Sequence, residues 1–151
     1  MKVKKTWRIL LAVACLGAAL LLFLRFAPGG LAVQTLETTS GKTGAAMVEV
    51  RLPATLSAKA AAGKTYFDAA CASCHGANAA GQDGIAPPLV HKIYEPSHHG
   101  DAAFLVAVRD GARQHHWSFG SMLPVEQKLT DGEIASIILD VRELQRESGI
   151  M

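Results

Sequence analysis

The hydrophobic positions of this 151-residue chain follow two different patterns. Near the N-terminus, the sixteen residues from Ile9 to Leu24 carry no charge. At about 1.5 Å of rise per residue, the longer apolar stretch from Trp7 to Ala27 spans roughly 31 Å, which matches a bilayer core of about 30 Å. This pattern predicts one transmembrane helix, an N-terminal membrane anchor within residues 1–30.

Further along, apolar residues recur at helical spacing. Ser57 is expected to cap a helix over 58–70, and a second helix is expected over 101–110, ending at Gly111. Thr130 and Glu133 have the spacing of a capping box, with Leu129 placed to staple onto the helix that follows. The apolar stripe of that last helix is Ile134, Ile137, Ile138, Val141 and Leu144. The sequence therefore predicts an all-α domain whose long loops enclose a cofactor or do other work.

Residues 31–56 separate these two regions; they follow Pro28-Gly29-Gly30 and begin with a stretch rich in Thr, Ser and Gly. Such a composition predicts a flexible linker. Within it, Val48, Val50 and Leu52 alternate with polar residues or Met, so a short strand is expected over 47–52. The predicted organisation is an anchor over 1–30, a linker over 31–56 and a folded domain over 57–151.

Charge is distributed unevenly along the chain. Residues 1–30 carry five basic side chains and no acid, whereas residues 31–151 carry 10 basic and 13 acidic side chains. The acidic balance and the lack of a basic run argue against nucleic-acid binding by the domain. Four of the N-terminal positive charges precede the apolar span, so we expect the N-terminus in the cytoplasm and the domain outside it. The alternative is a cleaved signal peptide, with Gly30-Leu31-Ala32 as the nearest cleavage site.

The chain holds one highly specific chemical motif, Cys71-Ala72-Ser73-Cys74-His75. This C-x-x-C-H sequence is the attachment signature of c-type haem. Two thiols at this spacing can each bond to one vinyl group of a porphyrin, and the adjacent histidine can then reach the iron. A thioredoxin-like pair would need a βαβ context that the pattern lacks, and a zinc site would lack further ligands at the usual spacing.

Several other segments of the chain have a characteristic spacing from this motif. Gly63 and Phe67 precede it at four-residue intervals, Pro87-Pro88-Leu89 follows it, and Met122 lies 47 residues after His75. Together with Leu129 to Glu133, these features resemble the class I, monohaem cytochrome c family over residues 57–148. Two positions depart from the family pattern. The closing helix lacks the usual aromatic residue, and Leu123 separates Met122 from Pro124.

The resemblance implies a small haem domain with one covalently attached haem c, bonded to Cys71 and Cys74. It implies His75 and Met122 as axial ligands of the iron, with the carbonyl of Pro87 orienting His75. The remaining expected haem-pocket residues are Phe67, Leu89 and Trp117, the last as a donor to a haem propionate or as a wall of the crevice.

Five of the six histidines fall within residues 91–116: His91, His98, His99, His115 and His116. One of them in place of Met122 would give bis-histidine ligation, which is the alternative for the distal side. Imidazoles also suit copper and zinc, so His98, His99, His115 and His116 are candidates for a second metal site. The competing interpretation is that they are polar loop residues, because neighbouring loop histidines tend to point in different directions.

These features together predict an electron carrier and not an enzyme. The expected function is single-electron transfer between redox proteins at the outer face of the cytoplasmic membrane, with neither nucleic acid nor a small-molecule substrate as partner. One alternative is the haem subunit of a larger oxidase or dehydrogenase complex. The other is a catalytic or sensor haem protein with an exchangeable sixth ligand.

Overall fold

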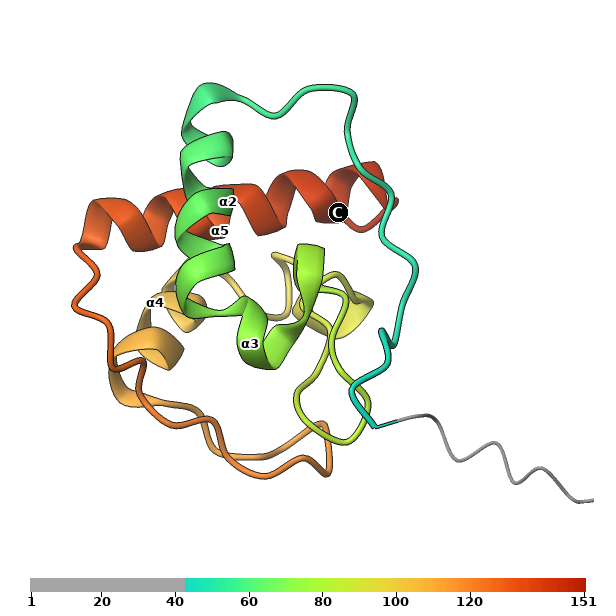
Figure 1. The fold of residues 1–151 in the computed structure, drawn as a ribbon, viewed down its shortest axis with the longest axis vertical. Coiled ribbons are helices and arrows are strands. Elements are labelled where there is room, and N and C mark those ends of the chain that lie inside the picture. The colour runs from blue at the N-terminus through green and yellow to red at the C-terminus, as the bar shows by residue number, and fades with distance from the viewer. Residues whose placement is uncertain (1–42) are drawn as a thin grey trace, which may run out of the picture. The chain divides into compact units, whose positions relative to one another are not determined.

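The computed structural model describes residues 43–151, and this part of the chain is helical. Its elements are α2 (Ala58–Ala70), α3 (Ala72–His75), the 3-10 turns η1 (Ala77–Ala79) and η2 (Lys92–Tyr94), α4 (Asp101–Asp110) and α5 (Asp131–Glu147). Pairing between extended segments over 43–151 is limited to two isolated antiparallel bridges, Gln82 with Ala86 and Ala112 with Met122. Long loops connect the helices (Figure 1). The prediction of an all-α domain with long loops is confirmed for these residues.

The helix ends lie where the capping residues predict them. The Ser57 hydroxyl accepts a hydrogen bond from the Ala60 N–H at 3.2 Å, which satisfies a free donor in the first turn of α2. At the start of α5, the Glu133 N–H donates to the Thr130 hydroxyl at 3.3 Å, and the Thr130 N–H donates to the Glu133 carboxylate at 2.7 Å. The capping box predicted from the sequence is therefore present.

Helices α2 and α5 form the main packed pair of the domain and cross each other in Figure 1. The crossing depends on Gly63, because a Cβ there would collide with the backbone carbonyl of Ser136. Phe67 is 1% exposed and packs in a core cluster with Ile137, Val141 and Leu144. The pair therefore packs through a close backbone contact at Gly63 and through aliphatic side chains of α5.

A buried arginine joins α5 to α4 and to the loop that precedes α4. The Arg142 guanidinium donates to Asp101 at 2.9 Å and to the backbone carbonyls of Tyr94 at 2.7 Å and His99 at 2.6 Å. It also lies over the Phe104 ring, 4.9 Å from the ring centroid. One side chain of α5 thus fixes the backbone of residues 94–101.

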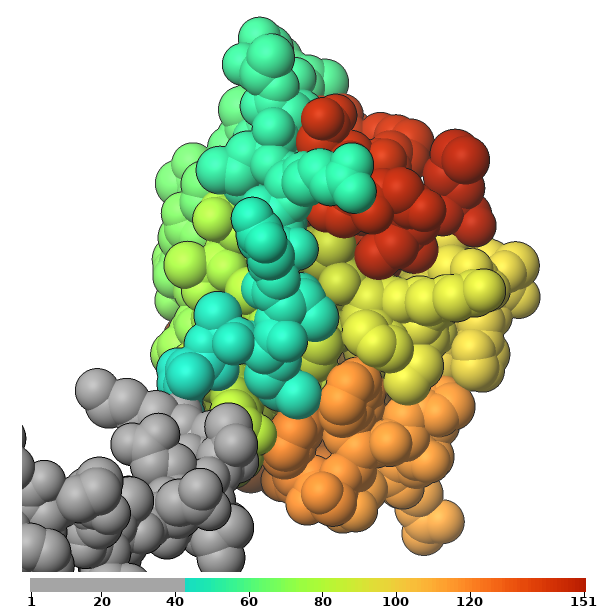
Figure 2. All heavy atoms as spheres, turned by 90° about the vertical axis from the view of Figure 1, so that its right-hand side faces the viewer, coloured from blue at the N-terminus to red at the C-terminus, as the bar shows by residue number. Residues whose placement is uncertain are grey.

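The structure of residues 43–56 differs from two of the predictions made for the linker. This segment is extended but forms no strand, so the strand predicted over 47–52 is wrong. Instead, the N–H groups of Met47 and Val48 both donate to the Ala80 carbonyl, at 3.1 and 3.2 Å. Arg51 donates to the Ser148 hydroxyl at 3.2 Å, and the segment lies along the domain surface in Figure 2. The prediction of a free tether therefore does not hold for residues 43–56.

No helix within residues 43–151 is both long and apolar enough to cross a membrane. The predicted anchor over residues 1–30 lies outside the described residues, as does the first part of the predicted linker.

Candidate functional site

The cysteine motif occupies the short turn of helix after α2. Cys71 is the C-cap of α2 and the N-cap of α3, and the His75 N–H donates to the Cys71 carbonyl at 2.9 Å. This turn places both thiols and the imidazole on one compact piece of backbone. The Cys71 side chain is partly buried, and Cys74 is exposed.

Gln82 holds this turn in place. Its amide nitrogen lies 3.3, 2.8 and 3.1 Å from the carbonyl oxygens of Ala72, Ser73 and Cys74, in the order of the chain. The Ala72 carbonyl also accepts from the Gly76 N–H at 2.9 Å, whereas the carbonyls of Ser73 and Cys74 lie at the end of this four-residue helix, where the Gln82 amide supplies a donor. Gln82 was not predicted from the sequence, because no local pattern shows that a residue eight positions after Cys74 folds back onto the motif.

The state of the thiols argues against thiol–disulfide chemistry. Burial, and secondarily the nearby Cys74, raises the pKa of the Cys71 thiol to about 11. Catalytic redox pairs depend instead on a depressed pKa that supplies thiolate near neutral pH. The environment of Cys71 therefore agrees with a structural attachment point and not with a thioredoxin-like centre.

His75 is buried and its ring is oriented. Nδ1 lies 2.9 Å from the Pro87 carbonyl oxygen, the partner expected from the resemblance. Because a carbonyl oxygen can only accept, Nδ1 carries the proton and Nε2 keeps a free lone pair. Burial lowers the pKa of His75, and the bond to Pro87 opposes this shift. A neutral, oriented imidazole of this kind is suited to bind a metal through Nε2.

The loop that carries Pro87 is anchored to the core. The N–H of Leu89 donates to the Ala79 carbonyl at 2.9 Å, and Gln145 of α5 donates to the Leu89 carbonyl at 2.8 Å. The Leu89 side chain packs against the core cluster that contains Phe67. Two of the predicted haem-pocket residues, Phe67 and Leu89, therefore lie in or against one apolar core.

Trp117 leaves a buried polar atom without a partner. Its indole Nε1 is buried and has no hydrogen-bond partner among residues 43–151. The ring makes an edge contact with His91, with centroids 5.2 Å apart, and lies parallel to Phe119 at 5.8 Å. Burial raises the pKa of the nearby Tyr94 hydroxyl, while a side-chain contact with Trp117, which falls short of hydrogen-bond geometry, acts in the opposite direction. A buried N–H without an acceptor fits a group bound there that brings one, such as a haem propionate.

Met122 lies in the same loop as Trp117, and its backbone is fixed. Its N–H donates to the Ala112 carbonyl at 2.9 Å, and Ala112 returns the bond at 3.0 Å. Gly111 permits this pairing because it has a φ of +79°, and a Cβ there would lie 2.5 Å from the Met122 carbonyl. The side chain of Met122 is partly buried. The structure thus holds the predicted distal residue in a defined hairpin.

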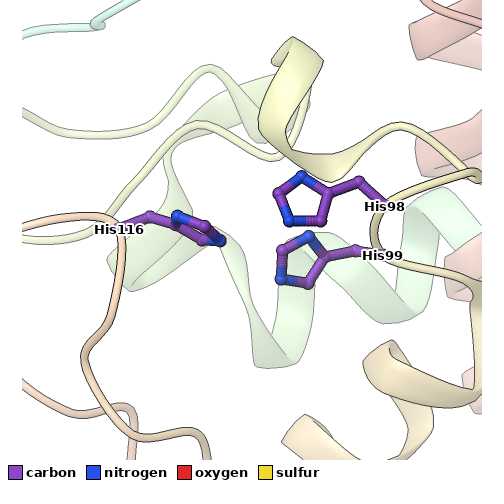
Figure 3. A group of neighbouring side chains, drawn as sticks. All are labelled: His98, His99 and His116. Carbon is purple, nitrogen blue, oxygen red and sulfur yellow. The ribbon is translucent and has the colours of Figure 1, made fainter.

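The structure also brings four of the loop histidines together. His98 and His99 precede α4, while His115 and His116 follow it, yet their ring centroids lie between 4.2 and 5.6 Å apart in the contacting pairs. In Figure 3, His98 and His99 project from one turn toward His116 on the opposite loop. Desolvation, and then the charges of His115, His99 and His98, lower the pKa of His116. The interpretation that these histidines point in different directions is therefore wrong for this group.

His91 is not part of that cluster. Its Nδ1 accepts a hydrogen bond from the Ile93 N–H at 3.2 Å, so the side chain caps η2.

Together, the helical fold and the site define a class of protein: a small domain that carries one C-x-x-C-H motif beside a buried, oriented histidine. A comparison with protein families agrees, because the model of the Cytochrome c family matches residues 60–144. This chain belongs to the cytochrome c family. Membership implies a covalently bound haem c, electron transfer as the function and redox proteins as partners. Comparisons with curated proteins and with solved structures gave no match.

Proposed function

We propose that this protein is a membrane-anchored monohaem cytochrome c that carries single electrons between redox proteins on the outer side of the cytoplasmic membrane. Its iron is held by His75 and Met122, and its porphyrin is bonded to Cys71 and Cys74. The observation that carries the proposal is His75: a buried imidazole beside the two thiols, with Nδ1 bonded to Pro87 at 2.9 Å and Nε2 left free.

When bound, the haem supplies an iron that changes between the ferrous and ferric states. The protein's own residues fix the conditions for this change. The Pro87 carbonyl holds the proton on Nδ1 of His75, which keeps the imidazole in one orientation in both states. The pairing of Ala112 with Met122 fixes the backbone from which the thioether would reach the iron, and a thioether ligand would favour the ferrous state. Two fixed ligands leave little to reorganise when an electron arrives.

The exposure of the motif indicates where electrons enter and leave. Cys74 is exposed while His75 is buried, so the edge of a porphyrin bonded to Cys74 lies near solvent. Trp117 offers its unpaired N–H to a propionate, which would bury the polar end of the group. A partner protein could then approach the edge of the porphyrin that carries the thioether of Cys74.

The membrane part of the proposal rests on the sequence of residues 1–30, with its apolar span and its preceding basic residues. A tethered domain reaches a membrane-bound donor and acceptor at an effective concentration that its linker sets. Attachment of haem through thioethers outside the cytoplasm agrees with this placement.

One experiment tests location and redox function together. Membranes from cells that express the full chain are washed with high salt and then titrated electrochemically. We expect the haem to stay in the membrane, because an apolar helix is insensitive to screening, and to titrate as a single one-electron centre, with one haem per chain. Release by salt would refute the anchor. A high-spin haem that binds carbon monoxide without displacing a ligand would instead indicate catalysis or sensing.

A further inference from the structure

The histidine cluster contains a contact that neutral imidazoles alone do not explain. The Nε2 atoms of His99 and His115 lie 3.3 Å apart. At the other side of each ring, His99 Nδ1 lies 2.7 Å from the Ile93 carbonyl and His115 Nδ1 lies 2.6 Å from the Arg113 carbonyl. Since carbonyl oxygens only accept hydrogen bonds, both Nδ1 atoms carry protons. In the neutral rings, the two Nε2 lone pairs therefore face each other with no hydrogen between them.

From this geometry we infer that His98, His99, His115 and His116 form a binding site for a tetrahedral divalent metal ion of the zinc type. The ion would lie between the facing Nε2 lone pairs of His99 and His115, with His116 and His98 completing the ligand set. This site is separate from the haem and serves as a clasp between the loop before α4 and the loop after it.

The separation of the two nitrogens fits a tetrahedral ion. Zinc binds imidazole nitrogen at about 2.0–2.1 Å, so two ligands at a tetrahedral angle lie about 3.3–3.4 Å apart. Neighbouring ligands of a square-planar ion at the same bond length would lie about 2.8–3.0 Å apart. The observed 3.3 Å agrees with the tetrahedral arrangement. Between the two metals considered from the sequence, this favours zinc over the tetragonal form of copper.

Two further ligands are within reach. One potential ligand atom from each of His98, His99 and His116 lies within 4.8 Å of the other two, and His115 lies outside this group of three but reaches it through the 3.3 Å contact between its Nε2 and that of His99. His98 and His116 are exposed, so their rings can rotate the remaining distance without disturbing the core. Their converging positions are visible in Figure 3. An ion can also enter directly, since the cluster opens to solvent.

The backbone under the cluster is held independently of any ion. On one side, the N–H of His99 donates to the Glu95 carbonyl at 2.8 Å, while the His99 carbonyl accepts from the buried Arg142 at 2.6 Å. On the other side, the Gln114 N–H donates to the Ser121 hydroxyl at 3.2 Å within the hairpin of Met122. Carbonyl partners on the outer nitrogens, as on His99 and His115, are the usual support of zinc-bound histidines.

Titration of the purified holoprotein with Zn²⁺ tests the inference. The full chain is stripped with a chelator, titrated calorimetrically, and analysed for zinc and iron after dialysis. We expect one zinc per haem iron and, by X-ray absorption at the zinc edge, a four-coordinate shell of nitrogen at about 2.0 Å. Absence of stoichiometric zinc binding would overturn the inference and leave a shared proton as the reason for the short contact.

Variants locate the site. The double change His99→Gln with His115→Gln is expected to weaken zinc binding about 100-fold or more, because it removes both facing ligands. The matched control is His91→Asn, which removes a histidine outside the cluster and keeps a side chain that can cap η2. We expect the control to bind zinc like the parent, and the double variant to keep the parent haem spectrum. Equal zinc affinity in the double variant would place the zinc elsewhere and refute the inference.

The haem spectrum separates this result from the proposed function. A change to high-spin iron in the double variant would mean that one of these histidines is a haem ligand, which contradicts both the separate zinc site and ligation by Met122. An unchanged spectrum with lost zinc binding supports the clasp, whatever the redox partners of the haem are.

Discussion

Asp140 is a carboxylic acid buried to 1% exposure on α5, with Oδ1 unpaired among the described residues. Burial raises its pKa from 3.8 to about 6; Lys64 opposes the shift, while Asp68 and Glu143 add to it. The folded protein therefore keeps this proton at pH values where the unfolded chain has lost it. Since the unfolded state then binds fewer protons, stability falls as the pH rises from about 4 to 6.

The change Asp140→Asn should remove this dependence, because the amide stays neutral. The shift of about two pKa units corresponds to up to about 3 kcal/mol. We expect Asp140→Asn to unfold at higher denaturant concentration than the parent at pH 7.5, and at about the same concentration at pH 4. Glu147→Gln, at an exposed acid of the same helix, serves as the control and should show no such difference between the two pH values. A stability gain for Asp140→Asn that is equal at both pH values would contradict the account.

At the scale of single residues, the sequence was sufficient to predict the site residues that a local motif defines. The C-x-x-C-H motif identified Cys71, Cys74 and His75, and the Pro87 contact followed from the family resemblance. Gln82, Asp140 and Arg142 were not foreseen. Each acts through partners that lie elsewhere in the fold, and a Gln, Asp or Arg in a polar sequence gives no signal of burial.

At the scale of elements, Gly63 sets the distance between α2 and α5. The change Gly63→Ala places a methyl group against the Ser136 backbone, and neither partner is a flexible side chain. The helices must separate, so we expect a loss of about 1–3 kcal/mol in the free energy of unfolding, measured by denaturant titration of the helical signal.

Gly132→Ala is the matched control, because it is the same substitution on the partner helix. A Cβ at Gly132 has only the Thr130 hydroxyl oxygen near it, at 4.0 Å. Alanine is also the better helix former, so stability should stay the same or rise by up to about 1 kcal/mol. Similar effects of the two changes would show that the crossing is not set by Gly63.

The helices were predictable and their connections were not. Ser57, Gly111 and the Thr130–Glu133 box mark the helix ends through contacts within a few residues, so local sequence was enough. The alternation over 47–52 predicted a strand that does not form. The N–H groups of Met47 and Val48 donate to the Ala80 carbonyl instead, and residues 43–151 contain no neighbouring strand with which the segment could pair. The histidines converge because Arg142 and the Ala112–Met122 pairing fix two loops on either side of α4, which no local pattern reveals.

At the scale of the whole domain, helices and loops have different roles. Helices α2 and α5 form a rigid pair, and the segments between them carry the residues that hold the haem and the clustered histidines (Figure 1). The loop that supplies Met122 also supplies Trp117, His115 and His116. One loop thus carries both the proposed distal ligand of the haem and two residues of the proposed zinc site.

The ligation of the iron by Met122 is the central claim, and the near-infrared absorption of the ferric full-length protein tests it most directly. Methionine bound to ferric haem gives a weak charge-transfer band in this region. We expect the parent protein to show this band with a low-spin spectrum, and Met122→Ala to lose it while keeping its covalent haem. A parent protein without the band, or a Met122→Ala variant that retains it, would contradict the account and assign the sixth position to another residue.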